Sequence, residues 1–292
     1  MGISEKFDTF CTNLRMATKV VEDISIRYKQ ITKRLNIDFY ENESDTLHSL
    51  YVGSYGRGTE IYTSDIDMLF ILPVTVYQQY NAYAYNGQSA LLQAVKNSIC
   101  KTYSTTYVGA DGQVIKLDFS DGICYEIVPC FLNTDGSYTF PDSNEGGTWK
   151  TTNPKPEIEE MTVANKNWNK NLKRLCRMVR SWKEVWNVPI GGLLIDTFAY
   201  NFLKDSEYKD KSFVYYDWIT RDFFKYLKDR DENQTYWLSP GANQSVKRTG
   251  KFEYKAKQCY NLALEAIDFE EKKYEYSANS KWREIYGTRF PS

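Results

Sequence analysis

The first 35 residues carry apolar side chains at steps of three and four. This spacing places one apolar stripe along one side of a helix. The pattern therefore predicts a single helix over residues 3–35, about 50 Å long at a rise of 1.5 Å per residue. The stripe consists of Phe7, Phe10, Leu14, Ala17, Val21, Ile24, Tyr28, Ile31 and Leu35.

Residues 50–72, LYVGSYGRGTEIYTSDIDMLFIL, predict a short strand, a glycine-rich turn that opens a helix, and a second apolar strand. Gly53 and Gly56 allow a backbone to approach a ligand closely, and N–H groups at the start of a helix bind anions. Ser54 adds a hydroxyl group. The turn is therefore a candidate phosphate-binding site.

Two aspartates open the second of these strands. Asp65 and Asp67 are two residues apart, so on a strand their carboxylates point to the same side, and Ile66 and Met68 face the core. Mg²⁺ binds in proteins through one or two carboxylates together with substrate phosphates. Two metal ions at one site require a third carboxylate nearby.

A hairpin centred on residues 120–122 supplies two candidates for that third carboxylate. A two-residue turn would pair Leu117 with Glu126 and place a carboxylate on the apolar face. A three-residue loop with Gly122 in the left-handed conformation pairs Lys116 with Glu126 instead. We predict the second register, which puts Lys116, Asp118 and Glu126 on one polar face of the hairpin.

Most of the remaining chain reads as helical. Residues 132–157 are rich in Gly, Asn, Asp and Pro and predict a long connection. After it, Lys173, Arg177 and Arg180 form a basic stripe beside an apolar one on a predicted helix. The apolar stripe holds Trp168, Leu172, Leu175, Val179, Trp182 and Trp186, and further helices are predicted over residues 77–103, 189–203, 215–227 and 253–269.

Composition narrows the class of protein. The 292 residues include 37 basic and 38 acidic residues, and a net charge of −1 argues against a constitutive nucleic-acid binder. The six cysteines contain no CxxC pair and the only histidine is His48, and both observations argue against a zinc finger. The cysteines are therefore expected to be packed thiols. Without a signal peptide or an apolar run of 18 residues, the chain is expected in the cytoplasm and off the membrane.

Three motifs resemble those of known nucleotidyltransferases. A Gly-Ser pair followed about ten residues later by Asp-x-Asp resembles the signature of the polymerase-β-like superfamily. Glu126-Ile-Val-Pro resembles the third-acid position of oligoadenylate synthetases and archaeal CCA-adding enzymes, with Glu in place of the usual Asp. This resemblance favours Glu126 and leaves Asp118 as the alternative. Arg180 stands where the oligoadenylate synthetases carry a triphosphate-binding lysine.

Over nearly its whole length the chain resembles the CD-NTases of anti-phage signalling, bacterial relatives of cyclic GMP-AMP synthase. The resemblance implies an α+β fold with a mixed sheet and a long spine helix in a catalytic core over residues 1–165. A helical domain over residues 166–292 would close a bilobed molecule with the active site in its cleft. The resemblance implies no zinc-dependent sensing of DNA, because no zinc-binding insertion is present.

The same resemblance implies a function and its residues. A cyclic di- or trinucleotide would be made from NTPs (ATP, GTP or pyrimidine NTPs) and would activate a separate effector. A template-independent RNA polymerase and a degenerate nucleotide-binding module are the alternatives, and base, linkage, ring size and activating signal stay open. Two Mg²⁺ ions, or Mn²⁺, would bind Asp65, Asp67 and Glu126, and the triphosphate would bind Gly53, Ser54, Lys173, Arg177 and Arg180.

Overall fold

The computed structural model describes residues 1–62 and 65–292, which form two compact units. Residues 63 and 64 belong to the motif stretch 50–72 and lie outside the described residues. Residues 1–15, 57–62 and 155–165 belong to the helical unit, whereas the sequence predicted a catalytic core over residues 1–165. The sheet unit comprises Met16–Gly56 and Thr63–Pro154, and the helical unit comprises Met1–Arg15, Arg57–Tyr62 and Lys155–Ser292.

The prediction of a single N-terminal helix over residues 3–35 is wrong. The structure has two helices, α1 (Ile3–Asn13) and α2 (Thr18–Tyr40), and the residue before α2 is in an extended conformation. The apolar stripe is continuous in the sequence, but in the structure Ala17 and Val21 are exposed and the other members serve two separate cores. Phe7 lies in the core of the helical unit and Ile31 in the core of the sheet unit. Periodicity alone does not distinguish one core from two.

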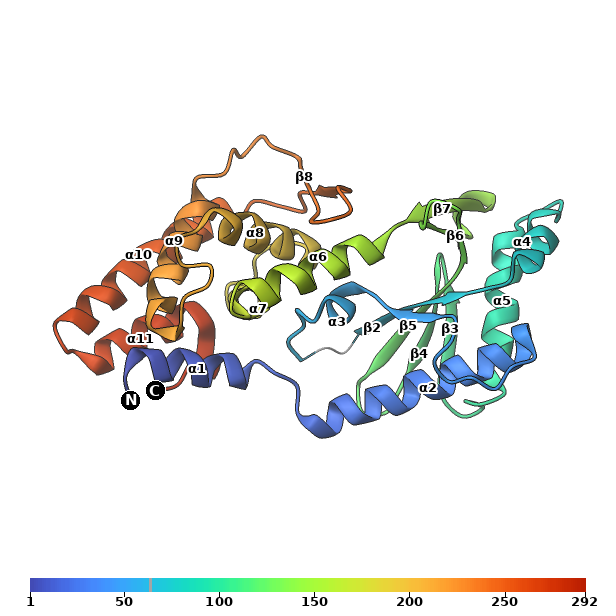
Figure 1. The fold of residues 1–292 in the computed structure, drawn as a ribbon, viewed down its shortest axis with the longest axis horizontal. Coiled ribbons are helices and arrows are strands. Elements are labelled where there is room, and N and C mark those ends of the chain that lie inside the picture. The colour runs from blue at the N-terminus through green and yellow to red at the C-terminus, as the bar shows by residue number, and fades with distance from the viewer. Residues whose placement is uncertain (63–64) are drawn as a thin grey trace. The chain divides into compact units, whose positions relative to one another are not determined.

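The sheet unit contains, in its described residues, a seven-stranded mixed sheet (Figure 1). Its main path runs β1-β2-β5-β4-β3, with β2 parallel to β5 and the other neighbours antiparallel. The far end of β5 pairs with β6, and β6 pairs with β7. The strands are β1 (Ser49–Tyr51), β2 (Asp65–Ile71), β3 (Tyr107–Asp111), β4 (Val114–Asp118), β5 (Cys124–Leu132), β6 (Tyr138–Asp142) and β7 (Thr148–Thr152).

One face of this sheet is apolar and packs against α2 and α5 (Gly87–Cys100). Ile66 and Met68 are fully buried in that core, as the strand pattern predicted. Burying such side chains contributes about 1.5–3 kcal/mol each. The remaining members of this face include Phe70, Ile115, Leu117, Tyr125 and Ile127, which are also fully buried.

The predicted register of the hairpin is confirmed. Lys116 is the partner of Glu126, and Gly122 has a φ of +87° in the loop. The buried residues Leu117 and Tyr125 pair on the opposite face. A register shifted by one residue would bury a charge, and that cost makes the pairing predictable from sequence.

Two other expectations for the sheet unit are wrong. Residues 77–103 form two helices, α4 (Val74–Asn81) and α5, because the Asn86 side chain accepts a hydrogen bond from the Ser89 N–H and caps a new helix. The predicted connection over residues 132–157 contains strands β6 and β7. Trp149 on β7 donates from Nε1 to Asn81 Oδ1 at 2.9 Å, which gives this tryptophan a structural role.

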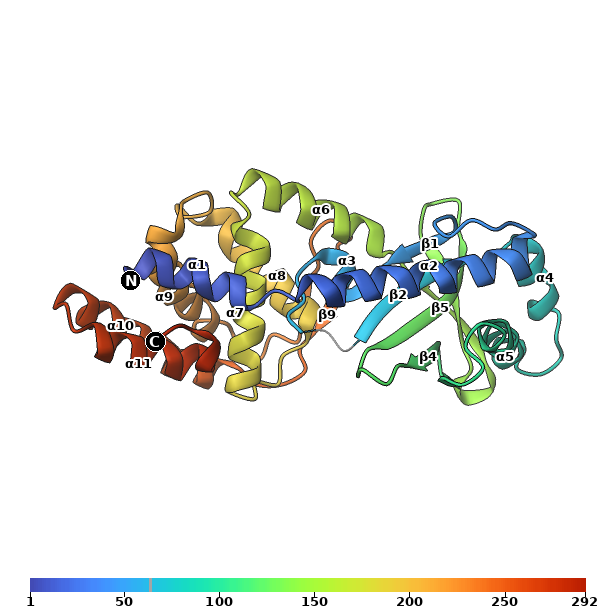
Figure 2. The same ribbon diagram turned by 90° about the horizontal axis from the view of Figure 1, so that it is seen from below.

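In the helical unit, four members of the predicted apolar stripe are buried on α7 in a core shared with the surrounding helices, namely Leu172, Leu175, Val179 and Trp182. Trp168 and Trp186 lie just outside the ends of α7 and are partly buried. Helices α10 and α11 lie side by side in both views (Figure 2). The α+β class predicted from sequence is confirmed. The helices are α1, α6 (Pro154–Asn167), α7 (Asn171–Val185), α8 (Gly192–Asp205), α9 (Tyr216–Lys228), α10 (Glu253–Glu271) and α11 (Glu275–Tyr286), with a small hairpin of β8 (Tyr236–Leu238) and β9 (Ser245–Lys247).

Candidate active site

The glycine-rich turn lies directly against one of the predicted metal-binding aspartates. Gly53 and Ser54 open the short helix α3 (Gly53–Arg57), as the sequence predicted. Gly53 has a φ of +60°, and a Cβ placed there would lie 1.8 Å from Asp67 Oδ2. The backbone N–H of Val52 also donates to the Asp67 carbonyl at 2.9 Å. Only glycine satisfies both the left-handed backbone and this close approach.

The polar face of the sheet arranges its acidic residues in two cross-strand rows. One row joins Asp67 on β2 to Glu126 on β5 and Lys116 on β4. The other row contains Asp65, Cys124 and Asp118 on the same three strands. Neighbouring strands lie about 4.8 Å apart, so Glu126 is one strand from Asp67, and Asp118 is two strands from Asp65.

Glu126 has a basic partner on this face. Lys116 Nζ lies 3.0 Å from Glu126 Oε1, with side chains 41% and 30% exposed. In the second row, burial and the adjacent Asp118 carboxylate raise the pKa of the Cys124 thiol to about 12, so this cysteine stays protonated at neutral pH. The two rows therefore combine four carboxylates with one ammonium group, and Asp111 on β3 adds a further carboxylate to the same face.

These carboxylates are hard oxygen donors of the kind that Mg²⁺ prefers. Among the described residues, no three acidic, Cys or His side chains form a closed metal-binding cluster. Asp65, Asp67 and Glu126 could hold cations together with oxygen atoms from a bound phosphate. The donor chemistry of the face and the turn against Asp67 thus fit a magnesium-phosphate ligand.

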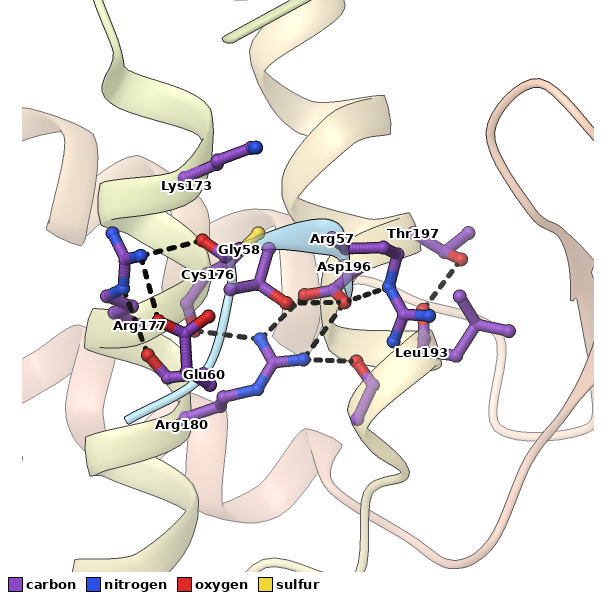
Figure 3. Close-up of polar contacts among 12 residues, drawn as sticks. Arg57, Gly58, Glu60, Lys173, Cys176, Arg177, Arg180, Leu193, Asp196 and Thr197 are labelled. Carbon is purple, nitrogen blue, oxygen red and sulfur yellow. Dashed lines mark hydrogen bonds and ion pairs between the residues drawn. The ribbon is translucent and has the colours of Figure 1, made fainter. Parts of the chain in front are cut away.

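In the helical unit, the predicted phosphate-binding Arg180 is engaged by a buried acid (Figure 3). Arg180 is 8% exposed, and its Nη1 and Nη2 lie 2.6 and 2.9 Å from the two carboxylate oxygens of Asp196. Nη2 also donates to the Gly192 carbonyl at 3.1 Å. Arg57 Nε binds the same carboxylate at 2.8 Å, and Thr59 Oγ1 donates to it at 3.0 Å.

Asp196 is fully buried between these two guanidinium groups. Burial alone would raise its pKa, but Arg180 and Arg57 outweigh burial and lower the pKa of Asp196 to about 2. The Arg57 side chain also lies 3.8 Å from Glu157, another buried acid. Two arginines and two acids therefore form a buried set of balanced charges.

The other two basic residues of the stripe differ in their contacts. Arg177 donates from Nε to the Glu60 carbonyl at 2.9 Å and from Nη2 to the Gly58 carbonyl at 2.7 Å. Lys173 makes no ion pair with any described residue, and its Nζ has one long hydrogen bond to Thr162 at 3.5 Å. Figure 3 shows no hydrogen bond or ion pair between Lys173 and the other residues drawn. Burial and the nearby Arg177 lower the pKa of Lys173.

Arg57 and Asp196 were not predicted as members of the site. A signal for Asp196 was present, because it is a lone charge in the apolar segment PIGGLLIDTFAY. A charge in such a segment is buried, and buried charges need partners. Its partners lie 16 and 139 residues away in sequence, so they were not predictable from spacing. His48 has a structural role, because its Nδ1 lies 2.6 Å from Asn36 Oδ1 and its ring stacks on Tyr40.

We expect Asp196→Asn to destabilise the protein by about 3–5 kcal/mol, because it leaves two buried guanidinium groups without their counter-charge. Since the pKa of Asp196 falls on folding from 3.8 to about 2, its carboxylate stabilises the fold above about pH 4. That contribution is lost as the pH falls from about 4 to about 2.

Urea denaturation of the wild type and of Asp196→Asn between pH 2 and pH 7 measures both effects. The control is Asp268→Asn, which breaks an exposed pair with Lys272 and should change the free energy of unfolding by less than about 1 kcal/mol. An Asp196→Asn protein as stable as the control variant would contradict a structural role for this network.

Comparison with known proteins agrees with this fold. The E. coli MS115-1 CdnC structure, solved in a complex with HORMA-deltaN, superimposes with a TM-score of 0.70 at 13% identity over 99% of this chain and 98% of that one. The Bradyrhizobium diazoefficiens CD-NTase CdnG, solved with GTP, gives 0.66 at 9% identity over 98% and 94%. Vibrio cholerae DncV, a cyclic AMP-GMP synthase, gives 0.61 at 13% identity over 99% and 87%.

The fold is therefore that of the CD-NTases, as the sequence motifs indicated. Residues 1–165, more than half of the chain, match the family model described as the Second Messenger Oligonucleotide or Dinucleotide Synthetase (SMODS) domain. The chain belongs to the SMODS family. It is also 25% identical over 179 residues to a probable cyclic nucleotide synthase of Bacillus cereus (strain VD146). That match covers 58% of this chain and 52%, about half, of the relative's length.

Proposed function

We propose that this protein is a nucleotidyltransferase that makes a cyclic di- or trinucleotide from NTPs and releases pyrophosphate. The observation that carries the proposal is the cross-strand row that joins Asp67 to Glu126, beside a Gly53-Ser54 turn packed against Asp67. Membership of the SMODS family and the CD-NTase fold support the same reaction class.

The residues of the sheet unit would bind and order the reacting groups. Asp65, Asp67 and Glu126 would hold two Mg²⁺ ions, or Mn²⁺, which when bound neutralise phosphate charge and lower the pKa of the attacking hydroxyl. Gly53 and Ser54 would offer backbone N–H groups and a hydroxyl to the triphosphate. Glu126 would take the proton of the hydroxyl whose oxygen attacks the α-phosphorus as the bond to pyrophosphate breaks.

We assign the positive charge toward the triphosphate chiefly to Lys173. Its ammonium is the one in the basic stripe without an ion pair among the described residues. Arg180 and Arg177 already bind Asp196, Glu60 and backbone carbonyls. Their guanidinium groups hold residues 57–60 against α7 and α8, and this gives them a supporting role.

Lys173→Ala should therefore weaken NTP binding by about tenfold or more, since a hydrogen bond to a charged group contributes about 1.5–3 kcal/mol. Its melting temperature should stay near that of the wild type. Arg180→Ala should instead lower the melting temperature, because the buried Asp196 loses its bidentate partner. Calorimetric titration with a non-hydrolysable NTP, together with thermal unfolding, measures both.

The control is Lys166→Ala, an exposed lysine near the end of α6. Equal NTP affinities for Lys173→Ala and Lys166→Ala would contradict the assignment of Lys173.

The biological setting follows from the same proposal. A cyclic nucleotide would act on a separate effector protein in an anti-phage response, and the synthase itself would work in the cytoplasm. Within the described residues, the structure contains no helix of the length and apolar character needed to cross a membrane.

The proposal is tested by incubating the purified protein with radiolabelled NTPs and Mg²⁺ or Mn²⁺. We expect a small product that resists phosphatase, because cyclisation leaves no terminal phosphate. Products of increasing length on an added RNA would instead indicate a template-independent polymerase. Absence of any product with all four NTPs, singly and in mixtures and under both metals, would contradict the proposal.

A further inference from the structure

We propose that Lys116 is a positioning residue that holds Glu126 in the nucleotide-free protein and weakens the binding of divalent cations to the carboxylate face. The inference rests on the proposed function, since it takes that face as the metal-binding one. It goes further by assigning a role in metal loading to a residue that is neither a metal ligand nor a phosphate ligand.

The pairing of Lys116 with Glu126 is set by the sheet. The two residues are direct cross-strand partners on β4 and β5, and Lys116 Nζ lies 3.0 Å from Glu126 Oε1. Glu126 is in turn the partner of Asp67 on β2. Three neighbouring strands thus hold two carboxylates and one ammonium group in one row. The ion pair between Lys116 and Glu126 therefore does not depend on a flexible loop.

Lys116 is the one cationic residue in the two described rows that contain the predicted metal ligands, and Asp111 lies one row further along the same face. Counting the next strand, β3, the described rows contain Asp67, Glu126, Lys116 and Gly109, and Asp65, Cys124, Asp118 and Tyr107. Four carboxylates on neighbouring strands repel one another, and like charges placed across a sheet are destabilising. The ammonium group offsets part of that repulsion when no metal is bound.

The same charge opposes a divalent cation. A metal ion that binds Glu126 must break or share its ion pair with Lys116, and the ammonium repels the incoming charge. A bound triphosphate adds several negative charges beside the face and shifts the balance toward the metal. Lys116 would therefore make metal loading depend on nucleotide, so that the catalytic cations arrive together with the substrate.

The test is a titration of the nucleotide-free protein with Mn²⁺, followed by the electron paramagnetic resonance signal of free Mn²⁺. Lys116→Gln should tighten Mn²⁺ binding by about tenfold, the order expected for removing a like charge at this range near a protein surface. Lys116→Arg keeps the charge and should stay within about twofold of the wild type.

A matched control is Lys150→Gln. Lys150 is also on a strand, is 49% exposed and forms an ion pair with Asp142, but it lies on β7, away from the two rows. Its substitution should leave Mn²⁺ affinity unchanged. This separates an effect of Lys116 on the face from a general effect of removing one positive charge from the protein.

Thermal unfolding gives a second measurement. Without metal, Lys116→Gln should melt at a lower temperature than the wild type, and saturating Mg²⁺ should raise its melting temperature by more than it raises that of the wild type. A lower melting temperature with unchanged Mn²⁺ affinity would show a merely structural role and overturn the inference. Absence of Mn²⁺ binding by Lys116→Gln would overturn it as well.

These measurements use no nucleotide, so their outcome is separate from that of the synthesis assay. A wild-type protein that makes no product from NTPs would contradict the proposed function, while the Mn²⁺ titration would still be readable. Conversely, product formation with unchanged Mn²⁺ affinity in Lys116→Gln would leave the proposed function standing and remove the role of Lys116.

Discussion

Combining Asp65→Asn with Asp67→Asn should abolish product formation while the protein stays folded. The amide keeps the size of each side chain and removes its charge, so the loss acts on metal and phosphate binding. Asp65 is exposed and Asp67 half-buried at the mouth of β2, where packing tolerates the change. Loss of one electrostatic contact to a transition state already lowers the rate by about 10²–10³-fold. We therefore expect the loss of both carboxylates to lower the rate of product formation at least about a thousandfold.

The measurement is synthesis of labelled product by the double variant, with its melting temperature as a check on folding. Asp268→Asn is the control, because Asp268 is an exposed aspartate on α10 that is not on the acidic face of the sheet. A double variant that retained a rate near that of the wild type would remove the metal assignment.

The sequence predicted correctly those parts of the fold in which the cost of burying one charged side chain decides between two arrangements. The register of the β4-β5 hairpin is one of these, since the alternative would place Glu126 among apolar side chains. The inward direction of Ile66 and Met68 is another. In both, the period of two along a strand leaves one arrangement without a buried charge.

The prediction failed where one local pattern allowed two tertiary arrangements. The apolar stripe of residues 3–35 is continuous in the sequence, yet α1 and α2 pack into different cores, and Ala17 and Val21 near the break are exposed. Neither glycine nor proline marks the break, so the periodicity suggested one helix. Strands β6 and β7 were not predicted for another reason: turn residues between and around them dominate the composition of residues 132–157.

In the candidate site, too, one part could be predicted from the sequence and another part could not. Its sheet residues follow from motif and alternation, and the structure places Gly53 against Asp67 and Glu126 beside it. The basic stripe on α7 was visible in the sequence, but its contacts were not. Whether an arginine binds a substrate or a buried acid depends on Asp196, which comes from another helix.

The two candidates for the third carboxylate occupy different positions on the sheet. Glu126 is the direct partner of Asp67 on the adjacent strand. Asp118 lies across from Cys124, which separates it from Asp65. Two strand spacings amount to about 10 Å, which is too far for Asp118 to share a metal ion with Asp65 without a large displacement. The geometry therefore favours Glu126 in spite of its longer side chain.

We expect Glu126→Gln to decrease turnover by about a hundredfold or more, the low end of general-base effects, with NTP binding little changed. Asp118→Asn should decrease turnover by less than about fivefold, because its carboxylate lies outside the row that contains Asp67. Initial rates at saturating NTP and Mg²⁺ give the comparison, and the melting temperature of each variant shows whether it is folded.

The ranking of the two variants decides which carboxylate acts. If Asp118→Asn were the more damaging, Asp118 would take the catalytic role and Glu126 would remain its neighbour, held by Lys116. Because the hairpin register places both side chains on one face, two nearly silent variants cannot be explained by a shifted strand. They would show that the reaction does not use a third carboxylate from this hairpin, and the chemistry would then depend on Asp65 and Asp67 alone.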